Sequence, residues 1–147
     1  MYAKQPKKLL ILNILDILWK DSDQDHRLTQ REIGEILRTR YGMAADRKAI
    51  KRNLMDLAEF GFDIEYREVP RGGAGEEEEN TILTDFYLVR PFTEGELRLL
   101  IDGLLFSRHL PHRQCRELVE KLEGLSSRYF RSRVRHIARM PGEQEDN

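Results

Sequence analysis

Several classes of protein are excluded by what this 147-residue sequence lacks. Its single cysteine, Cys115, rules out an intramolecular disulfide and fits a reducing cytosol. Its richest apolar run, from Leu9 to Trp19, is interrupted by Asn13 and Asp16 and falls short of the ~20 residues that span a bilayer. The flanks of this run also lack a signal-peptide cleavage pattern. The sequence therefore predicts a cytoplasmic protein without a membrane segment.

The chain also lacks a large net charge of either sign. Charged residues make up 35% of the chain, but the formal net charge is only −1. The distribution of charge along the chain is therefore more informative than its sum. Eight Arg and Lys face three acids between Arg27 and Arg52, and Ser126 to Met140 holds five Arg and no acid. The acidic balance lies in Glu76–Glu79 and the C-terminal tail. The basic patches are candidate surfaces for a polyanion, and solvated surface is the alternative.

No credible active site or metal site is found. His109, His112 and Cys115 are residue types that bind zinc, but Pro111 lies among them and no fourth ligand is evident. Cys115 lacks the partners of a catalytic nucleophile. The run Gly72–Gly75 lacks the Gly-Lys-Ser/Thr ending of a phosphate loop. The sequence therefore predicts no enzyme, no cofactor and no metal.

The stretch from Asp46 to Phe60 predicts a helix with two unlike sides. Asp46 can cap it, because a short carboxylate accepts the free N–H groups of the first turn. The apolar side repeats at helical spacing and consists of Ile50, Leu54, Leu57 and Ala58. The first two turns carry Lys48, Lys51 and Arg52 on the opposite side, with Arg47 nearer the seam. The helix dipole does not favour cations at this end, whereas the front of a recognition helix meets bases and phosphates in the major groove.

Two helices are predicted before this one. Pro6 or Lys7 opens a mostly apolar core helix that runs to about Lys20. Thr29 and Glu32 form a capping box for the next helix. Gly42 ends that helix, because glycine tolerates the left-handed backbone of a helix end. The inward residues of the second helix are Ile33, Ile36, Leu37 and Tyr41. Helix, short turn and basic helix together predict a helix-turn-helix, and a three-helix bundle without nucleic-acid binding is the alternative.

A β-hairpin is predicted to follow the basic helix. Ile64 and Tyr66 alternate with polar residues, and the β-branched and aromatic run from Ile82 to Val89 predicts a second strand. Two strands at this place make a wing. Its loop, Gly72 to Asn80, contains four Glu that DNA would repel, so the loop is expected to be mobile and held away. Arg67 and Arg71 at the base of the wing are the better contact candidates.

A helical segment is predicted after the wing. Thr93 and Glu96 form a second capping box, and Pro111 begins another helix. The two apolar stripes consist of Leu97, Leu100, Ile101, Leu104 and Leu105, and of Cys115, Leu118, Val119 and Leu122. A last short helix is marked by Tyr129, Phe130, Val134 and Ile137. These helices carry more apolar surface than the wing can cover, so we expect them to form a homodimer.

The order of these motifs resembles the N-terminal half of WYL-domain transcriptional regulators. The resemblance rests on Arg47, Ile50, Arg52, Leu54 and Leu57, then Gly61-Phe62-x-Ile64, the strand Asp85–Leu88, the helix start Phe92–Leu97, and Glu117–Ser126. It covers roughly Lys7 to Ile137, and no single motif in it is diagnostic. The family implies a winged helix-turn-helix, a connecting helical segment and a β-barrel sensor domain. That barrel is missing here, so the resemblance implies a fragment or a short relative without effector sensing.

The predicted fold is mainly α with a small β-hairpin wing. Residues 1–90 are expected to form a winged helix-turn-helix, residues 91–140 a helical dimerisation segment, and residues 141–147 a disordered acidic tail. The predicted function is a sequence-specific regulator that binds double-stranded DNA. A winged-helix interaction module without DNA affinity is the alternative, and RNA binding is a weaker third.

Each candidate DNA contact is given one role. Base reading is assigned to Lys48 and Arg52, which share one side of the helix. Phosphate contact is assigned to Arg47 and Lys51 on the same helix and to Thr29, Gln30 and Arg31 at the start of the helix before it. Arg67 and Arg71 complete the predicted interface from the wing.

Overall fold

A computed structural model describes residues 5–70, 81–107 and 109–130. The chain divides into two compact units, Met1–Val89 and Arg90–Asn147. The division falls beside the boundary predicted at residue 90. The architecture is mainly helical, with one antiparallel hairpin after the first three helices, as the sequence predicts.

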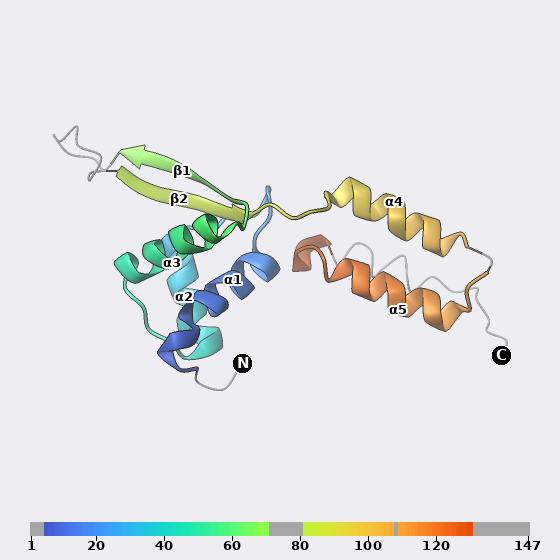
Figure 1. The fold of residues 1–147 in the computed structure, drawn as a ribbon, viewed down its shortest axis with the longest axis horizontal. Coiled ribbons are helices and arrows are strands. Elements are labelled where there is room, and N and C mark those ends of the chain that lie inside the picture. The colour runs from blue at the N-terminus through green and yellow to red at the C-terminus, as the bar shows by residue number, and fades with distance from the viewer. Residues whose placement is uncertain (1–4, 71–80, 108, 131–147) are drawn as a thin grey trace. The chain divides into compact units, whose positions relative to one another are not determined.

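The first unit is built on three helices (Figure 1). A short 3₁₀ turn, η1 (Lys7–Leu9), leads into α1 (Leu10–Asp21). Then follow α2 (Gln30–Tyr41) and α3 (Arg47–Phe60). Their apolar sides meet in one core, in which Ile14, Ile17, Leu18, Ile33, Leu37 and Leu54 are fully buried.

Local capping fixes where these helices begin and end. Thr29 caps α2 in a complete capping box with Glu32, and Asp46 caps α3 by accepting the Ala49 N–H at 2.8 Å. Gly42 ends α2 in the left-handed conformation, at φ 64°. These predictions from the sequence are confirmed.

The hairpin pairs β1 (Ile64–Pro70) with β2 (Thr81–Leu88) in antiparallel register. The register shifts between Glu65 and Arg67, and opposite this point Asp85 takes a positive φ of 59°. Such an irregularity is a β-bulge, which bends a strand and re-aims its side chains. The strict alternation expected for β1 is therefore not found: Tyr66 is 38% exposed, although its ring lies 5.5 Å from that of Phe86.

The hairpin is tied to the helices by three contacts along β2. Leu28 and Phe86 exchange two backbone hydrogen bonds, of 2.9 and 2.8 Å, which adds a one-residue bridge to the sheet. The Gln30 side-chain amide donates to the Leu83 carbonyl at 2.9 Å, and the Ser22 hydroxyl accepts the Leu88 N–H at 3.1 Å. The wing is thus held in a fixed position against the helices.

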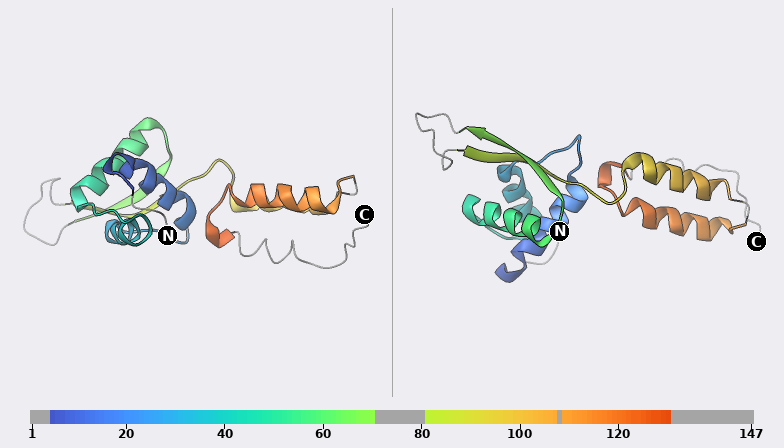
Figure 2. Two further views of the ribbon diagram at one scale, coloured as in Figure 1. Left: turned by 90° about the horizontal axis from the view of Figure 1, so that it is seen from below. Right: turned by 45° about the horizontal axis from the view of Figure 1, so that its top comes forward.

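The second unit contains two antiparallel helices, α4 (Glu94–Leu105) and α5 (His112–Glu123), which lie side by side (Figure 2). Thr93 and Glu96 form the capping box predicted for α4. The buried residues of this unit's core are Leu97, Ile101, Cys115, Val119 and Phe130. The predicted last helix falls mostly on residues 131–147, outside the described residues. In the described ranges, no helix has the length and apolarity that crossing a membrane requires.

Candidate nucleic-acid interface

The α3 helix presents its cations to solvent. Its apolar side is buried at Ile50, Leu54 and Leu57. Its first two turns expose Arg47, Lys48, Lys51 and Arg52. The carboxylates Asp56 and Glu59 follow in the later turns and are exposed as well. The solvent side of α3 is therefore cationic at its start and anionic towards its end, so only its front half suits a polyanion.

The turn before α3 is tightly built. The Met43 N–H donates to the Leu37 carbonyl at 3.1 Å, and the Met43 side chain is buried. A methyl group added at Gly34 would lie 3.4 Å from Ile50 Cδ1, so α2 and α3 are in direct contact there. Fixed contacts of this kind hold the basic turns of α3 in one position relative to α2.

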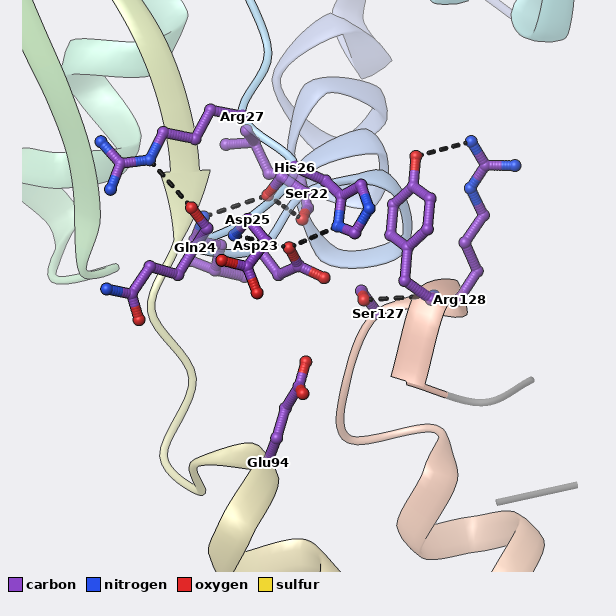
Figure 3. Close-up of polar contacts among 12 residues, drawn as sticks. Ser22, Asp23, Gln24, Asp25, His26, Arg27, Glu94, Ser127 and Arg128 are labelled. Carbon is purple, nitrogen blue, oxygen red and sulfur yellow. Dashed lines mark hydrogen bonds and ion pairs between the residues drawn. The ribbon is translucent and has the colours of Figure 1, made fainter. Parts of the chain in front are cut away.

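Most arginines of the described ranges have a side-chain partner. Arg38 pairs with Glu35, Arg40 with Asp21, and Arg67 with Asp85. Arg27 donates to the Gln24 carbonyl at 3.0 Å, beside the Asp23–His26 turn (Figure 3), and lies over the Tyr87 ring. Within the described ranges, the cationic side chains without an ion pair or hydrogen bond are Lys7, Lys8, Arg31, Arg47, Lys48, Lys51, Arg52 and Lys121. All but Lys121 lie in the first unit.

The three residues predicted at the start of α2 have different roles. Arg31 is exposed, and its guanidinium has no ion-pair or hydrogen-bond partner among the described residues. The Thr29 hydroxyl accepts the Glu32 N–H in the capping box. Gln30 is 6% exposed and its amide is bound to Leu83 O, so the prediction that Gln30 contacts DNA is wrong. A hydrogen bond across 53 residues is not visible in sequence spacing, which explains the error.

Of the two wing residues predicted to contact DNA, Arg67 lies in the described part of the chain. The Arg67 Nε donates to Asp85 Oδ2 at 2.7 Å, so its guanidinium braces the bulge although the side chain stays 59% exposed. Arg71 and the acidic loop Gly72–Asn80 lie outside the described residues.

Two lysines that we did not predict lie beside α3. Lys7 and Lys8 line a surface hollow of about 420 Å³ together with Asp46, Arg52 and Asn53. The apolar lining consists of Leu10, Ile11, Met43, Ala44, Ala45 and Ala49. The sequence does contain a signal, because two adjacent lysines precede an apolar core helix, but only the packing of α1 on α3 brings them to the same hollow as Arg52.

Two polar pairs, Arg40–Asp21 and Tyr41–Asp16, join α1 to α2 behind the exposed side of α3. The Arg40 guanidinium lies 2.6 Å from the buried Asp21 carboxylate, and this contact raises the pKa of Arg40 above its usual value. The Tyr41 hydroxyl donates to the Asp16 carboxylate, and burial together with this bond raises the pKa of Tyr41. Both pairs join α1 to α2, and both side chains keep their usual protonation at neutral pH.

His112 and Cys115 of the second unit take part in local contacts. The Cys115 thiol is buried and donates to the Leu104 carbonyl at 3.3 Å. His112 Nε2 lies 2.9 Å from an Arg116 nitrogen. Among the described residues, no group of three potential metal ligands comes together.

Comparisons with models of known protein families, with curated proteins and with solved structures return no match to this chain. The resemblance to WYL-domain regulators therefore rests on the sequence motifs alone and stays a hypothesis.

Proposed function

We propose that this protein is a sequence-specific DNA-binding transcriptional regulator whose α3 helix enters the major groove. The observation that carries the proposal is the set of four exposed cations in the first two turns of α3, Arg47, Lys48, Lys51 and Arg52, none of which has an intramolecular partner in the described ranges. Their apolar opposite side is used by the core, so the charge is not needed for folding. An unpaired, rigidly held cationic helix front is what base edges and phosphates require.

The positions on α3 suggest distinct roles. Lys48 and Arg52 are four residues apart and lie on the side opposite the core, where they would meet base edges. Arg47 and Lys51 lie on one flank, where a phosphate backbone would pass. Arg31, near the α2 N-terminus, adds a phosphate contact. From the order of the sequence motifs we further propose that the chain is the DNA-binding portion of a WYL-type regulator.

Selection of duplexes from a random pool, followed by titration, tests the function. Lys48→Ala and Arg52→Ala should each lose about 1–3 kcal/mol on the selected duplex and much less on a scrambled one. Lys51→Ala should weaken both duplexes alike and reduce the salt slope by about one. Lys121→Ala is the matched control, because Lys121 is an exposed lysine on α5 that is unpaired among the described residues. This variant should change neither the affinity for the two duplexes nor the salt slope. Equal binding of the parent, Lys48→Ala and Arg52→Ala to both duplexes would favour the interaction-module alternative.

A homodimer is part of the proposal, because readers of this class bind palindromic half-sites as dimers. The side of α4 that faces away from its core carries Leu99, 74% exposed, and Phe106, 83% exposed. Gly103 lies on the same side, and a methyl group there would meet nothing within 4 Å. A glycine inside a helix disfavours that helix by about 1 kcal/mol relative to alanine, so a close partner would explain it.

A second α4 is a suitable occupant for this face. If two copies pair antiparallel about an axis between Leu100 and Ile101, Phe106 of one falls opposite Gly95 of the other, since helix positions pair symmetrically about that axis. The same register places Arg98 opposite Gly103, one residue from the partner's Asp102, so a long arginine side chain can reach a carboxylate at the edge. The bulky ring then meets the residue with no side chain.

Sedimentation at micromolar concentration tests the dimer. We expect twice the chain mass of 17.4 kDa for the parent and a shift to the single-chain mass for Leu99→Glu. Leu12→Glu is the matched control, because Leu12 is also exposed but lies on α1. A parent that sediments only as a single chain would overturn this part of the proposal and leave the DNA contacts untouched.

A further inference from the structure

We propose that the hollow between the start of α1 and the front of α3 binds one sugar-phosphate unit of the DNA backbone. The inference rests on the proposed function and deepens it, because it adds a contact from a different element of the fold. The phosphate contacts are assigned to Lys7 and Lys8 on η1 and the sugar contact to the apolar floor, while Arg52 of α3 borders the hollow and adds positive charge beside the bases that it reads.

The rim of the hollow is cationic. Lys7 and Lys8 are exposed and, within the described ranges, have no ion-pair or hydrogen-bond partner, and the same is true of Arg52. The one carboxylate in the lining, Asp46, accepts the Ala49 N–H through Oδ1 and so is engaged as the α3 cap. Three positive charges against one negative charge favour an anion at the rim.

The floor is apolar, which distinguishes this hollow from a simple patch of lysines. It is lined by Leu10, Ile11, Met43, Ala44, Ala45 and Ala49, and its volume is about 420 Å³. An inorganic anion would use only the rim. A nucleotide backbone presents a charged phosphate beside a sugar whose carbon–hydrogen face is apolar, so it matches both rim and floor.

The position of the hollow fits a helix in the major groove. Successive α-helix residues are about 100° apart, so Ala49 and Asn53 lie on one flank of α3 and Arg47 and Lys51 on the other. The hollow is on the Ala49 flank. A helix in the groove has a phosphate backbone along each side. Lys7 and Lys8 would therefore contact one strand while Arg47 and Lys51 contact the other, and Lys48 and Arg52 face the bases between them.

Three variants of the full chain separate charge from shape. The double variant Lys7→Ala/Lys8→Ala removes the rim charges and leaves α3 unchanged. Ala44→Leu adds apolar bulk at an exposed edge of the floor without changing charge. Lys121→Ala is the control for loss of one lysine away from the hollow. Far-UV circular dichroism and the melting temperature of each variant establish that the fold is kept.

Binding is measured on the selected and scrambled duplexes at several salt concentrations. The lysine double variant should lose affinity about ten-fold on both duplexes and reduce the salt slope by about two, at roughly 0.9 for each phosphate contact. Ala44→Leu should weaken binding with an unchanged slope, because it excludes the sugar and removes no counterion release. Lys121→Ala should match the parent.

The outcomes distinguish this inference from the proposed function. If the lysine double variant and Ala44→Leu both bind the duplexes as tightly as the parent, the hollow is not a site for the DNA backbone. The proposed function would stand in that case. A parent that binds no duplex removes the function and the inference together. Inorganic phosphate could raise the melting temperature of the parent but not that of the double variant, while both bind duplexes equally well. That result would assign the hollow to a free anion and overturn the proposal.

Discussion

The two units of this chain differ in where unpaired cations and exposed apolar side chains gather. In the first unit, the cations on α3 and η1 have no partners among the described residues, whereas the arginines of α4 and α5 are paired with Glu94, Glu117 or His112. The second unit exposes Leu99 and Phe106 together on the side of α4 that faces away from its core, whereas the exposed Leu12 and Phe60 of the first unit lie on different helices, α1 and α3. Exposed ion pairs contribute little stability, so the pairing does not explain the folding of either unit. This difference is the basis on which we propose DNA as the partner of the first unit and a second copy of the chain as the partner of the second.

The largest contrast should come from two phenylalanines. Phe86 is fully buried in the first unit and Phe106 is 83% exposed in the second. Phe86→Ala should lower the free energy of unfolding by about 3–5 kcal/mol, because it removes a buried ring and leaves a cavity. Phe106→Ala should stay within about 0.5 kcal/mol in dilute solution and weaken self-association instead. Denaturant unfolding followed by far-UV circular dichroism reports on the helices of both units, and Trp19 fluorescence reports on the first unit alone, since Trp19 is the only tryptophan and lies on α1. Equal losses for the two variants would contradict the contrast.

A second comparison sets a buried ion pair against an exposed one. Arg40→Ala leaves the Asp21 carboxylate, which is 1% exposed, without its guanidinium partner and should cost about 3–5 kcal/mol. Arg113→Ala breaks an exposed pair with Glu117 at 3.7 Å and should cost less than about 0.5 kcal/mol. Chemical denaturation of the two variants side by side measures the difference. A mild effect of Arg40→Ala would mean that solvent reaches Asp21 readily.

The role of Gln30 can be separated from DNA binding. Gln30→Ala removes the amide that donates to Leu83 O and should destabilise the first unit by about 1–3 kcal/mol, because a buried acceptor loses its donor. Gln114→Ala, on the exposed side of α5, is the control and should be neutral. The salt slope of DNA binding should be unchanged in both variants. A slope reduced by about one in Gln30→Ala, with stability kept, would restore Gln30 as a phosphate contact.

The smallest effect is a pH dependence of the first unit. The pKa of Tyr41 in the folded state lies above its unfolded value of about 10, because of burial and the bond to Asp16. Its contribution to stability is complete below pH 10 and is lost as the pH rises towards the folded pKa. Parent stability should therefore fall more steeply than that of Tyr41→Phe above pH 10. The difference between their unfolding free energies at pH 8 and pH 11 measures it, and parallel curves would contradict it.

Much of the fold was predictable because its determinants are local. The capping boxes at Thr29 and Thr93, the cap at Asp46 and the stop at Gly42 act over three to five residues. Helical spacing placed Ile50, Leu54 and Leu57 in the core and so left the four α3 cations exposed. Each of these features depends on near neighbours and on the helical repeat, both of which the sequence contains.

The tertiary structure alone decided how distant segments meet. The bridge between Leu28 and Phe86, the burial of Gln30 under β2 and the bulge at Asp85 all join residues far apart in the chain or shift a strand register. The placement of Lys7 and Arg52 around one hollow follows from the packing of α1 on α3. Spacing in one segment carries no information about which distant backbone group will accept its hydrogen bond. The sequence by itself determined which side of α3 is charged, and the packed core determined which other residues share that surface.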